Sequence, residues 1–339
     1  MPVLLAILNA PMALRRSVRR RLFSIDPQDT LASKRGFDVP DDVAKERLQT
    51  IGATFVAGYH AAIDDDDPSR LCDRLAEHPN EQAGWAFEGA AMALALRDFI
   101  TPWNRRRFVR FLSAGGAPHT YLMHVGAGWV AARLHRDPVR FGRHLDPLLR
   151  WLAVDGYGFH EGYFRWRQIV DKRAKNKPYA PRLRGYGGHA YHQGLGRSLW
   201  FVEGTDLQRI VARIEEFPAQ YHGDLWSGLG LAAAYAGNGA EVDWQRLRVA
   251  SGDHAAAVAQ GVCFAAKARE RAGNPSPCTA TAAQAMWALS AAACAAESDV
   301  QERATADCDE SLDQPRYALW RQRIQESWLQ RQEAVEVPR

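Results

Sequence analysis

The stretch VGAGWVAARL, residues 125–134, shows the pattern that decides the fold of this 339-residue chain. In it a glycine opens a segment of alanine and large apolar residues, and the arrangement recurs along the sequence. The repeated glycines are Gly89, Gly126, Gly156, Gly194, Gly228 and Gly261, at intervals of 37, 30, 38, 34 and 33 residues. A period near 34 residues is typical of a helix pair that buries its apolar face against its neighbours. Glycine at the same point of each unit predicts close approach of adjacent helices.

Helix start and stop signals elsewhere agree with this pattern. Asp137 and Asp146 each stand before a proline, as an N-cap stands before the first helical position. Asp206 precedes apolar residues spaced for one helical face, and Pro218 follows them. Alanine is abundant over 254–296. We therefore predict an all-α protein of helix-pair repeats, either a tetratricopeptide-like superhelix or an α/α toroid, although the tetratricopeptide signature itself is missing.

The predicted organisation is one all-helical domain, residues 1–339. In it an N-terminal segment, 1–80, packs on helix-pair repeats over 81–300, and 301–339 form a C-terminal helix and tail. The chain is apolar from Pro2 to Leu14, and the five arginines that follow reverse the charge order of a secretory signal. We expect an apolar segment docked on the core and then a solvated basic turn; the alternative is an amphipathic helix on a membrane surface.

Composition excludes several classes of protein. Hydrophobic residues make up 47% and charged residues 24%, which is typical of a soluble globular chain. A net charge of +4 is too mild to indicate a nucleic-acid partner, and no apolar run reaches the ~18–20 residues of a membrane-spanning helix. The five cysteines are scattered and form no C-x-x-C pair, which argues against disulfides and structural zinc. We expect a cytoplasmic protein without stable membrane insertion. The sequence is compatible with either a monomer or a homodimer.

Two groups of polar residues lie in apolar sequence surroundings that suit acid–base chemistry. His160 and Glu161 belong to DGYGFHEGYF, residues 155–164, which is dense in aromatic residues and lacks the second histidine of a zinc-binding H-E-x-x-H helix. Apolar surroundings shift the pKa of either group, so the pair suits a general acid or base; the alternative is a hydrogen-bonded pair at a helix start. Glu88 precedes an Ala/Met/Leu segment and is either a structural ion-pair partner or an active-site acid.

Other motifs favour structural explanations. The G-x-G patterns never complete G-x-G-x-x-G, so no nucleotide cofactor is expected. His124 and His192 each have one histidine nearby, and two ligands do not make a metal site. Asp224 precedes a glycine-rich helix and reads as part of its N-terminal cap region. The basic stretch 165–184 is expected to be an exposed loop, with a lid as a further role.

The acidic run Asp64–Asp67 invites comparison with the Asp-rich motifs of terpene cyclases. Pro68 follows the run, which lies between two apolar helical segments. We expect a solvated interhelical loop that ends in a helix cap.

Several strings resemble a bacterial family long catalogued as a domain of unknown function and found in enediyne antibiotic gene clusters. They are FEGAAMALALRD (87–98), HVGAGWVAARL (124–134), LDPLLRWLAVDGYGFHEGYF (145–164), QGLGRSLWFV (193–202) and DLWSGLGLAAAYAG (224–237). The resemblance covers about residues 20–300. For members in anthraquinone-fused, tiancimycin-type enediyne pathways, it implies a cyclase that forms the intramolecular carbon–carbon bond between anthraquinone and enediyne, with epoxide chemistry.

We therefore expect a cofactor-independent cyclase of enediyne or polyketide biosynthesis that acts by acid–base catalysis on a large, flat aromatic or polyunsaturated substrate. The alternatives are a non-catalytic helical-repeat protein that binds or sequesters the natural product, and a terpene-type cyclase that uses the acidic run. The predicted catalytic residues are His160, Glu161 and Glu88, with His124, His192 and Asp224 as secondary candidates. The predicted substrate-binding residues are Trp129, Tyr157, Tyr163, Tyr191, Arg197, Trp200 and Trp226.

Overall fold

The computed structural model describes residues 12–101, 103, 105–171, 183–239 and 242–336, and in these ranges it contains helices but no strand. The prediction of an all-α protein is confirmed. The apolar segment before residue 12 and most of the basic stretch 165–184 lie outside the described residues.

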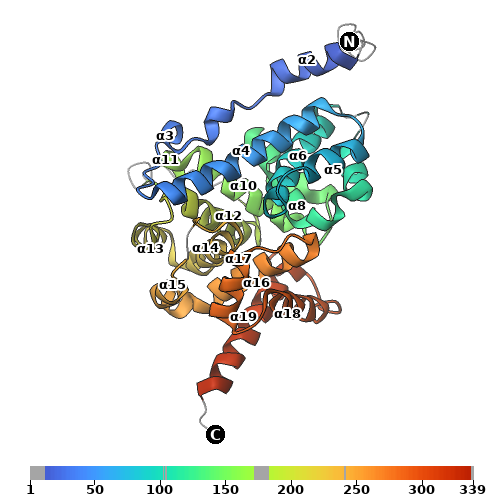
Figure 1. Ribbon diagram of the computed structural model, residues 1–339. Helices are drawn as coiled ribbons and strands as arrows, with labels where there is room; N and C mark the ends of the chain where they lie inside the picture. The colour runs from blue at the N-terminus through green and yellow to red at the C-terminus, as the bar shows by residue number, and fades with distance from the viewer. Residues whose placement is uncertain (1–11, 102, 104, 172–182, 240–241, 337–339) are drawn as a thin grey trace.

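A series of helices, called here the inner helices, forms the centre of the molecule (Figure 1). They are α4 (Asp42–Asp64), α6 (Asn80–Ile100), α8 (Thr120–Arg133), α10 (Arg150–Phe164), α12 (Gly187–Val202), α14 (His222–Ala236) and α16 (Ala255–Ala272). Each inner helix packs on the next one in chain order. Shorter helices connect them, namely α5 (Pro68–Ala76), α7 (Arg107–Phe111), α9 (Pro138–Phe141), α11 (Trp166–Ile169), α13 (Leu207–Glu215) and α15 (Trp244–Ser251).

The repeated glycines lie where neighbouring inner helices touch. A Cβ on Gly194 of α12 would lie 1.8 Å from the Asp155 carbonyl oxygen of α10, and one on Gly126 of α8 would lie 2.1 Å from the Glu88 carbonyl oxygen of α6. The second glycine of a G-x-G pair contacts the following helix instead, since a Cβ on Gly128 would lie 1.9 Å from the Ala153 carbonyl oxygen. Backbones at such distances leave no room for a side chain, so the predicted close approach is present.

The predicted helix starts are found, with one shift. Asp137 caps α9 and Asp206 caps α13 by accepting hydrogen bonds from backbone N–H groups of the first turn. Asp146 accepts from the N–H groups of Leu148 and Leu149 in the same way, but α10 begins only at Arg150. The Asp146 carbonyl oxygen accepts from the Arg150 N–H, so the capped residues form a single turn that leads into the helix.

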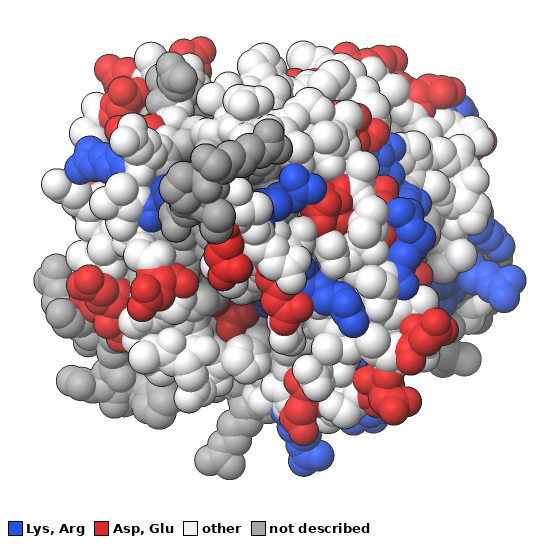
Figure 2. Space-filling view, turned by 90° about the horizontal axis from the view of Figure 1, so that it is seen from below, with Lys and Arg blue, Asp and Glu red and all other residues white. Residues whose placement is uncertain are grey.

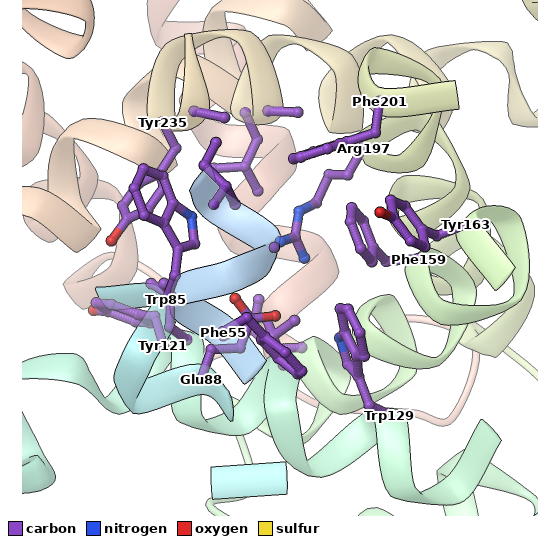
Figure 3. Close-up of a pocket in the computed structure, with 18 of the residues that line it drawn as sticks. Phe55, Trp85, Glu88, Tyr121, Trp129, Phe159, Tyr163, Arg197, Phe201 and Tyr235 are labelled. Carbon is purple, nitrogen blue, oxygen red and sulfur yellow. The ribbon is translucent and has the colours of Figure 1, made fainter. Parts of the chain in front are cut away.

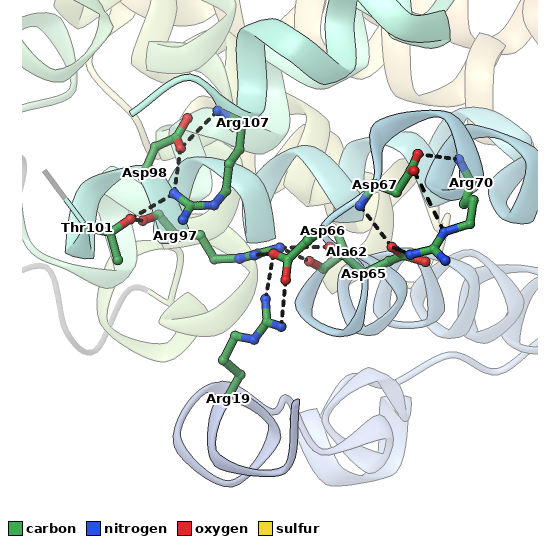
Figure 4. A network of polar contacts seen from close by, with 10 residues as sticks. All are labelled: Arg19, Ala62, Asp65, Asp66, Asp67, Arg70, Arg97, Asp98, Thr101 and Arg107. Carbon is green, nitrogen blue, oxygen red and sulfur yellow. Dashed lines mark hydrogen bonds and ion pairs between the residues drawn. The ribbon is translucent and has the colours of Figure 1, made fainter. Parts of the chain in front are cut away.

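The arginines after the N-terminal apolar segment do not form the predicted solvated turn. They belong to helix α2 (Met12–Phe23), whose Arg16 and Arg20 donate to the Asp64 carboxylate over 2.5–2.9 Å. Arg19 and the buried Arg97 hold Asp66 (Figure 4). Burial disfavours the charged form of Asp66, yet these two arginines lower its pKa to about 2. An ion-pair network therefore replaces solvent over part of the acidic run.

The rest of the acidic run behaves as predicted. Asp67 caps α5 by accepting from the N–H groups of Ser69 and Arg70, and Asp65 accepts from the Arg70 guanidinium (Figure 4). Across the described part of the chain, no group of three or more His, Cys, Asp or Glu side chains is arranged to hold a metal ion.

The C-terminal helices close one side of the array. Helices α17 (Pro277–Trp287), α18 (Ala291–Arg303) and α19 (Arg316–Glu336) all pack on α16. Lys, Arg, Asp and Glu side chains intermingle over the face in Figure 2, so no basic patch stands out there. Of the helices in the described ranges, none has the length and apolar character required to cross a membrane.

Candidate active site

A cavity lined mainly by aromatic side chains lies among the inner helices (Figure 3). The volume open to the centre of a water molecule is about 120 Å³, within about 1210 Å³ of space that includes the part reaching solvent. Because the first of these volumes is small compared with the second, the cavity is narrow. Its aromatic lining comprises Phe55, Trp85, Tyr121, Trp129, Phe159, Tyr163, Phe164, Phe201, Tyr235, Phe264, Tyr317 and Trp320.

The aromatic side chains form two groups with a polar pair between them (Figure 3). Trp85, Tyr121 and Tyr235 lie at one end, and Trp85 meets Tyr235 edge-on at 5.8 Å between ring centroids. At the other end Trp129 stacks on Phe159 at 5.2 Å. Glu88 and Arg197 project into the space between these ends, from α6 and α12.

Glu88 is a buried carboxyl group that forms no ion pair in the described part of the chain. It is 4% exposed, and the Trp129 indole interacts with it only weakly. Burial, and to a lesser extent the charge of Asp155, raises the pKa of Glu88 to about 7, against the lowering influence of Arg197 and the Trp129 indole. A carboxyl with this pKa can both donate and accept a proton at neutral pH.

Arg197 is held from behind by a buried carboxylate. Its Nη1 donates to Asp155, a fully buried residue of α10, and its guanidinium lies 5.1 Å from the Phe159 ring centroid. Burial raises the pKa of Asp155, although Arg197 acts in the opposite direction. The Arg197 side chain keeps 14% of its surface accessible, because it faces the cavity.

A set of buried polar residues, called here the polar layer, directly precedes five of the six repeated glycines. They are Glu88, Asp155, Gln193, Ser227 and Gln260. Helix α19 reaches the same layer: the Tyr317 hydroxyl donates to Gln193 Oε1 over 3.2 Å, and Arg321 donates to Gln260 Oε1 over 3.0 Å. The repeat therefore places a buried polar residue directly before the glycine in five of its six units, the exception being Val125 of α8.

Four of the predicted site residues line the cavity: Glu88, Trp129, Tyr163 and Arg197. The His160–Glu161 pair does not. Glu161 is buried and accepts from Arg165 over 2.9 Å, and the His160 ring lies edge-on to Trp129 at 5.7 Å. His160 thus lies directly behind the cavity wall formed by Trp129, while Glu161 is turned toward Arg165.

The other predicted catalytic residues are held by structural contacts away from the lining. His124 Nδ1 lies 2.7 Å from the Thr120 carbonyl oxygen, and His192 Nδ1 lies 2.7 Å from that of Gly188. Burial lowers the pKa of His192 to about 4, which keeps this ring neutral at pH 7. Asp224 is bound by Arg321 at 2.8 Å and by His189 at 2.7 Å.

The remaining predicted substrate-binding residues pack between helices and do not line the cavity. Tyr157 meets Tyr191 at 6.0 Å, Trp200 donates to the Gly237 carbonyl oxygen over 2.9 Å, and Trp226 is 4% exposed. The prediction omitted Phe159 and Phe164 of α10. It also omitted aromatic cavity residues of other helices, which are Phe55, Trp85, Tyr121, Phe201, Tyr235, Phe264, Tyr317 and Trp320.

The spacing of the sequence repeat predicts some of these cavity residues. The residue three positions after each glycine lies one helical turn beyond the polar residue that precedes the glycine, and so on the same face. At this position five of the six repeats contribute to the cavity, with Trp129, Phe159, Arg197, Leu231 and Phe264. Alignment of the repeats on their glycines adds Phe159, Leu231 and Phe264 to the residues already predicted.

Fold and site together define an all-helical protein whose inner helices enclose an aromatic cavity with a buried acid and an arginine. The chain belongs to the family described as "Protein of unknown function (DUF1702)", whose family model matches residues 14–328. No curated protein and no solved structure matches the chain. The resemblance to a family of unknown function is thereby confirmed, while its link to enediyne pathways stays a prediction.

Proposed function

We propose that the protein is a biosynthetic enzyme that binds a flat, largely apolar molecule in the aromatic cavity and transfers a proton through Glu88. The supporting observation is the Glu88 carboxyl group, which is buried, has no ion-pair partner among the described residues and is directed into the cavity (Figure 3). Burial of such a group is unfavourable unless a ligand or a proton compensates it. Buried acids with a shifted pKa in a cleft are typical of active sites.

The lining indicates the kind of substrate. Narrow space between aromatic faces favours a flat molecule, because offset stacking adds about 0.5–1.5 kcal/mol per ring pair beyond the burial of apolar area. The aromatic groups at the two ends are suited to hold two parts of one molecule, with Glu88 between them. Fixing two reacting parts in this way lowers the entropic barrier to ring closure.

The narrower proposal is a cofactor-independent cyclase. On the resemblance, the substrate is an anthraquinone-fused enediyne precursor in which an intramolecular carbon–carbon bond forms with epoxide chemistry. Opening an epoxide requires a proton on the departing oxygen, and Glu88 in its protonated form is suited to donate it. Helix-pair repeats, in a superhelical or toroidal arrangement, provide the frame for the cavity.

A second candidate is a protein that binds or sequesters the natural product without changing it. The small number of polar groups in the cavity favours this alternative, because stacking and apolar burial alone suffice for binding. In that case Glu88 and Arg197 only orient the ligand.

Metabolite profiling of a deletion strain separates the two candidates. Loss of the enzyme leads to an uncyclised precursor, whereas loss of a binder leaves the product structure intact. The deletion is complemented with wild type, with Glu88→Gln and with Glu203→Gln. Glu203 is a matched control, because it is equally buried but is paired with Arg209 and Arg213 outside the cavity.

We expect Glu88→Gln to slow turnover by about 10²–10⁴-fold and to accumulate the precursor, since a positioned acid or base contributes this much to a rate. Glu203→Gln restores product in proportion to its soluble amount. Full restoration by folded Glu88→Gln would show that Glu88 transfers no proton in the reaction.

A further inference from the structure

We propose that the molecule bound in the cavity carries an acidic hydroxyl group, a phenol or an enol, which lies between Glu88 and Arg197 and gives its proton to Glu88. This inference rests on the proposed function and adds the functional group that the site recognises. It follows from the contacts of Arg197, from the charges around Glu88, and from the residues that separate them from solvent.

Arg197 is prepared to bind an oxygen atom. Only its Nη1 is engaged in a hydrogen bond to a described residue, the carboxylate of Asp155. The guanidinium keeps further N–H donors, lies over the Phe159 ring and points toward Glu88 (Figure 3). A guanidinium anchored on one side and open on the other is a ready partner for an anionic oxygen.

Three charged or titratable groups surround Glu88. Helix α10 contributes Asp155, α12 contributes Arg197 and α14 contributes the Tyr235 hydroxyl. Burial raises the pKa of Tyr235, so this group stays neutral. From α4 and α8 the cavity wall near Glu88 is formed by Phe55 and Trp129, which carry no charge.

The charge balance of these groups selects the ligand. Arg197 and Asp155 neutralise each other, and the other charged lining residues are paired as well, Asp29 with Lys34 and Lys267 with Asp299. An ionised Glu88 is therefore the uncompensated charge among the described residues of the cavity. When a ligand hydroxyl gives its proton to Glu88, the ligand O–H bond breaks and a carboxyl O–H bond forms. The negative charge moves from the carboxylate to the ligand oxygen beside Arg197, and the net charge of the cavity does not change. Transfer therefore requires no further burial of charge.

Other ligand groups fit less well. A carboxylate or phosphate would bring a second negative charge next to Glu88 in an apolar cavity, which is unfavourable. A ligand with no polar group would leave the Arg197 donors without an acceptor. The raised pKa of Glu88 supports the same conclusion, because it brings the carboxyl closer to the pKa of an acidic phenol or enol, and proton sharing is most effective between matched groups.

The test uses 2-hydroxyanthraquinone, a flat phenol whose neutral and anionic forms absorb at different visible wavelengths. We expect the dye bound to wild type to be neutral at pH 6, where Glu88 is protonated, and to show the anionic band at pH 8. Binding of the dye at pH 8 should also add a proton to wild type that it does not add to Glu88→Gln, because the carboxylate accepts a proton and the amide does not. Calorimetry in buffers of different ionisation enthalpy counts this proton. Arg197→Gln removes the positive charge beside the ligand oxygen, and Arg197→Lys replaces it if that variant fails to fold. Arg197→Lys keeps a positive charge but loses the planar set of donors, so it weakens the anionic band.

Unsubstituted anthraquinone, which has no hydroxyl group, is the matched control ligand. Failure of both compounds to quench tryptophan fluorescence would refute the proposed binding function, and this inference with it. If anthraquinone binds but bound 2-hydroxyanthraquinone stays neutral at pH 8 in wild type, the inference is wrong while the binding function stands. An anionic dye bound to wild type without that added proton also overturns the inference, because it excludes Glu88 as the proton acceptor.

Discussion

Replacing Gly194 with alanine tests whether the close approach of inner helices holds the fold together. The added Cβ would lie 1.8 Å from the Asp155 carbonyl oxygen and 2.7 Å from the Phe159 backbone nitrogen. Real Cβ atoms essentially never approach another heavy atom within 3.0 Å, and both neighbours are backbone atoms that cannot rotate away. Helices α10 and α12 must therefore separate by about 1 Å, which weakens dispersion contacts along their whole interface.

The size of the effect follows from two opposing terms. Overpacking of a core costs typically 1–3 kcal/mol, and a clash with backbone belongs at the upper end, about 3 kcal/mol. Alanine returns about 1 kcal/mol through its better helix propensity. The expected net loss of unfolding free energy is therefore about 2 kcal/mol.

Gly223 in α14 provides the control, because its nearest neighbour to an added Cβ is His254 Nδ1 at 3.7 Å, an ordinary contact. Gly223→Ala should be neutral or stabilise the protein by up to about 1 kcal/mol. Urea unfolding, with reversibility checked by refolding, measures both variants against wild type. A Gly194→Ala protein as stable as Gly223→Ala would refute the view that these glycines set the distance between helices.

Three further predictions concern charged groups. Because the pKa of Glu88 is raised from 4.5 to about 7, wild type should lose up to about 3 kcal/mol of stability relative to Glu88→Gln as pH rises from 4.5 through 7. Urea unfolding at several pH values measures this loss, and a stability difference that does not change with pH contradicts it. Glu161→Gln weakens the partly buried contact with Arg165, so calorimetry should show that the unfolding free energy falls by about 1–3 kcal/mol while the affinity for 2-hydroxyanthraquinone is unchanged. Normal stability together with lost turnover would instead place the active site at His160 and Glu161. Asp67→Ala removes the cap of α5 and should lower the unfolding free energy by about 1 kcal/mol. Treatment of wild type with EDTA should leave dye binding unchanged, and a loss of binding that Mg²⁺ restores would indicate a metal role for the acidic run.

The repeated glycines made the array of helices predictable. Their spacing marks the inner helices because only glycine allows the backbone contact seen at Gly126 and Gly194, and a constraint that recurs in each unit is visible in the sequence. The N-terminal arginines were less predictable. Whether Arg19 meets water or Asp66 depends on a contact between residues 47 positions apart, which no local pattern records.

The candidate site was predictable only in part, for a related reason. Glu88 stood out as an acid in an apolar helix. The aromatic residues beside His160 suggested a pocket around that histidine, but Phe159 and Tyr163 turn to the cavity while Glu161 turns to Arg165. Residues one turn apart share a face and adjacent residues do not, so clustering along the sequence does not amount to clustering in space.

Helix α19 bears on how the chain folds as it is synthesised. Tyr317 and Trp320 line the cavity, and Arg321 binds Asp224, a residue 97 positions earlier. These residues leave the ribosome after all the inner helices, so the array must wait for them with the Asp224 carboxylate short of a partner and one side of its aromatic interior uncovered. A nascent chain in that condition exposes apolar surface for as long as translation lasts. Slow codons or a pause ahead of residue 316 should therefore increase dependence on chaperones, while leaving the finished protein unchanged.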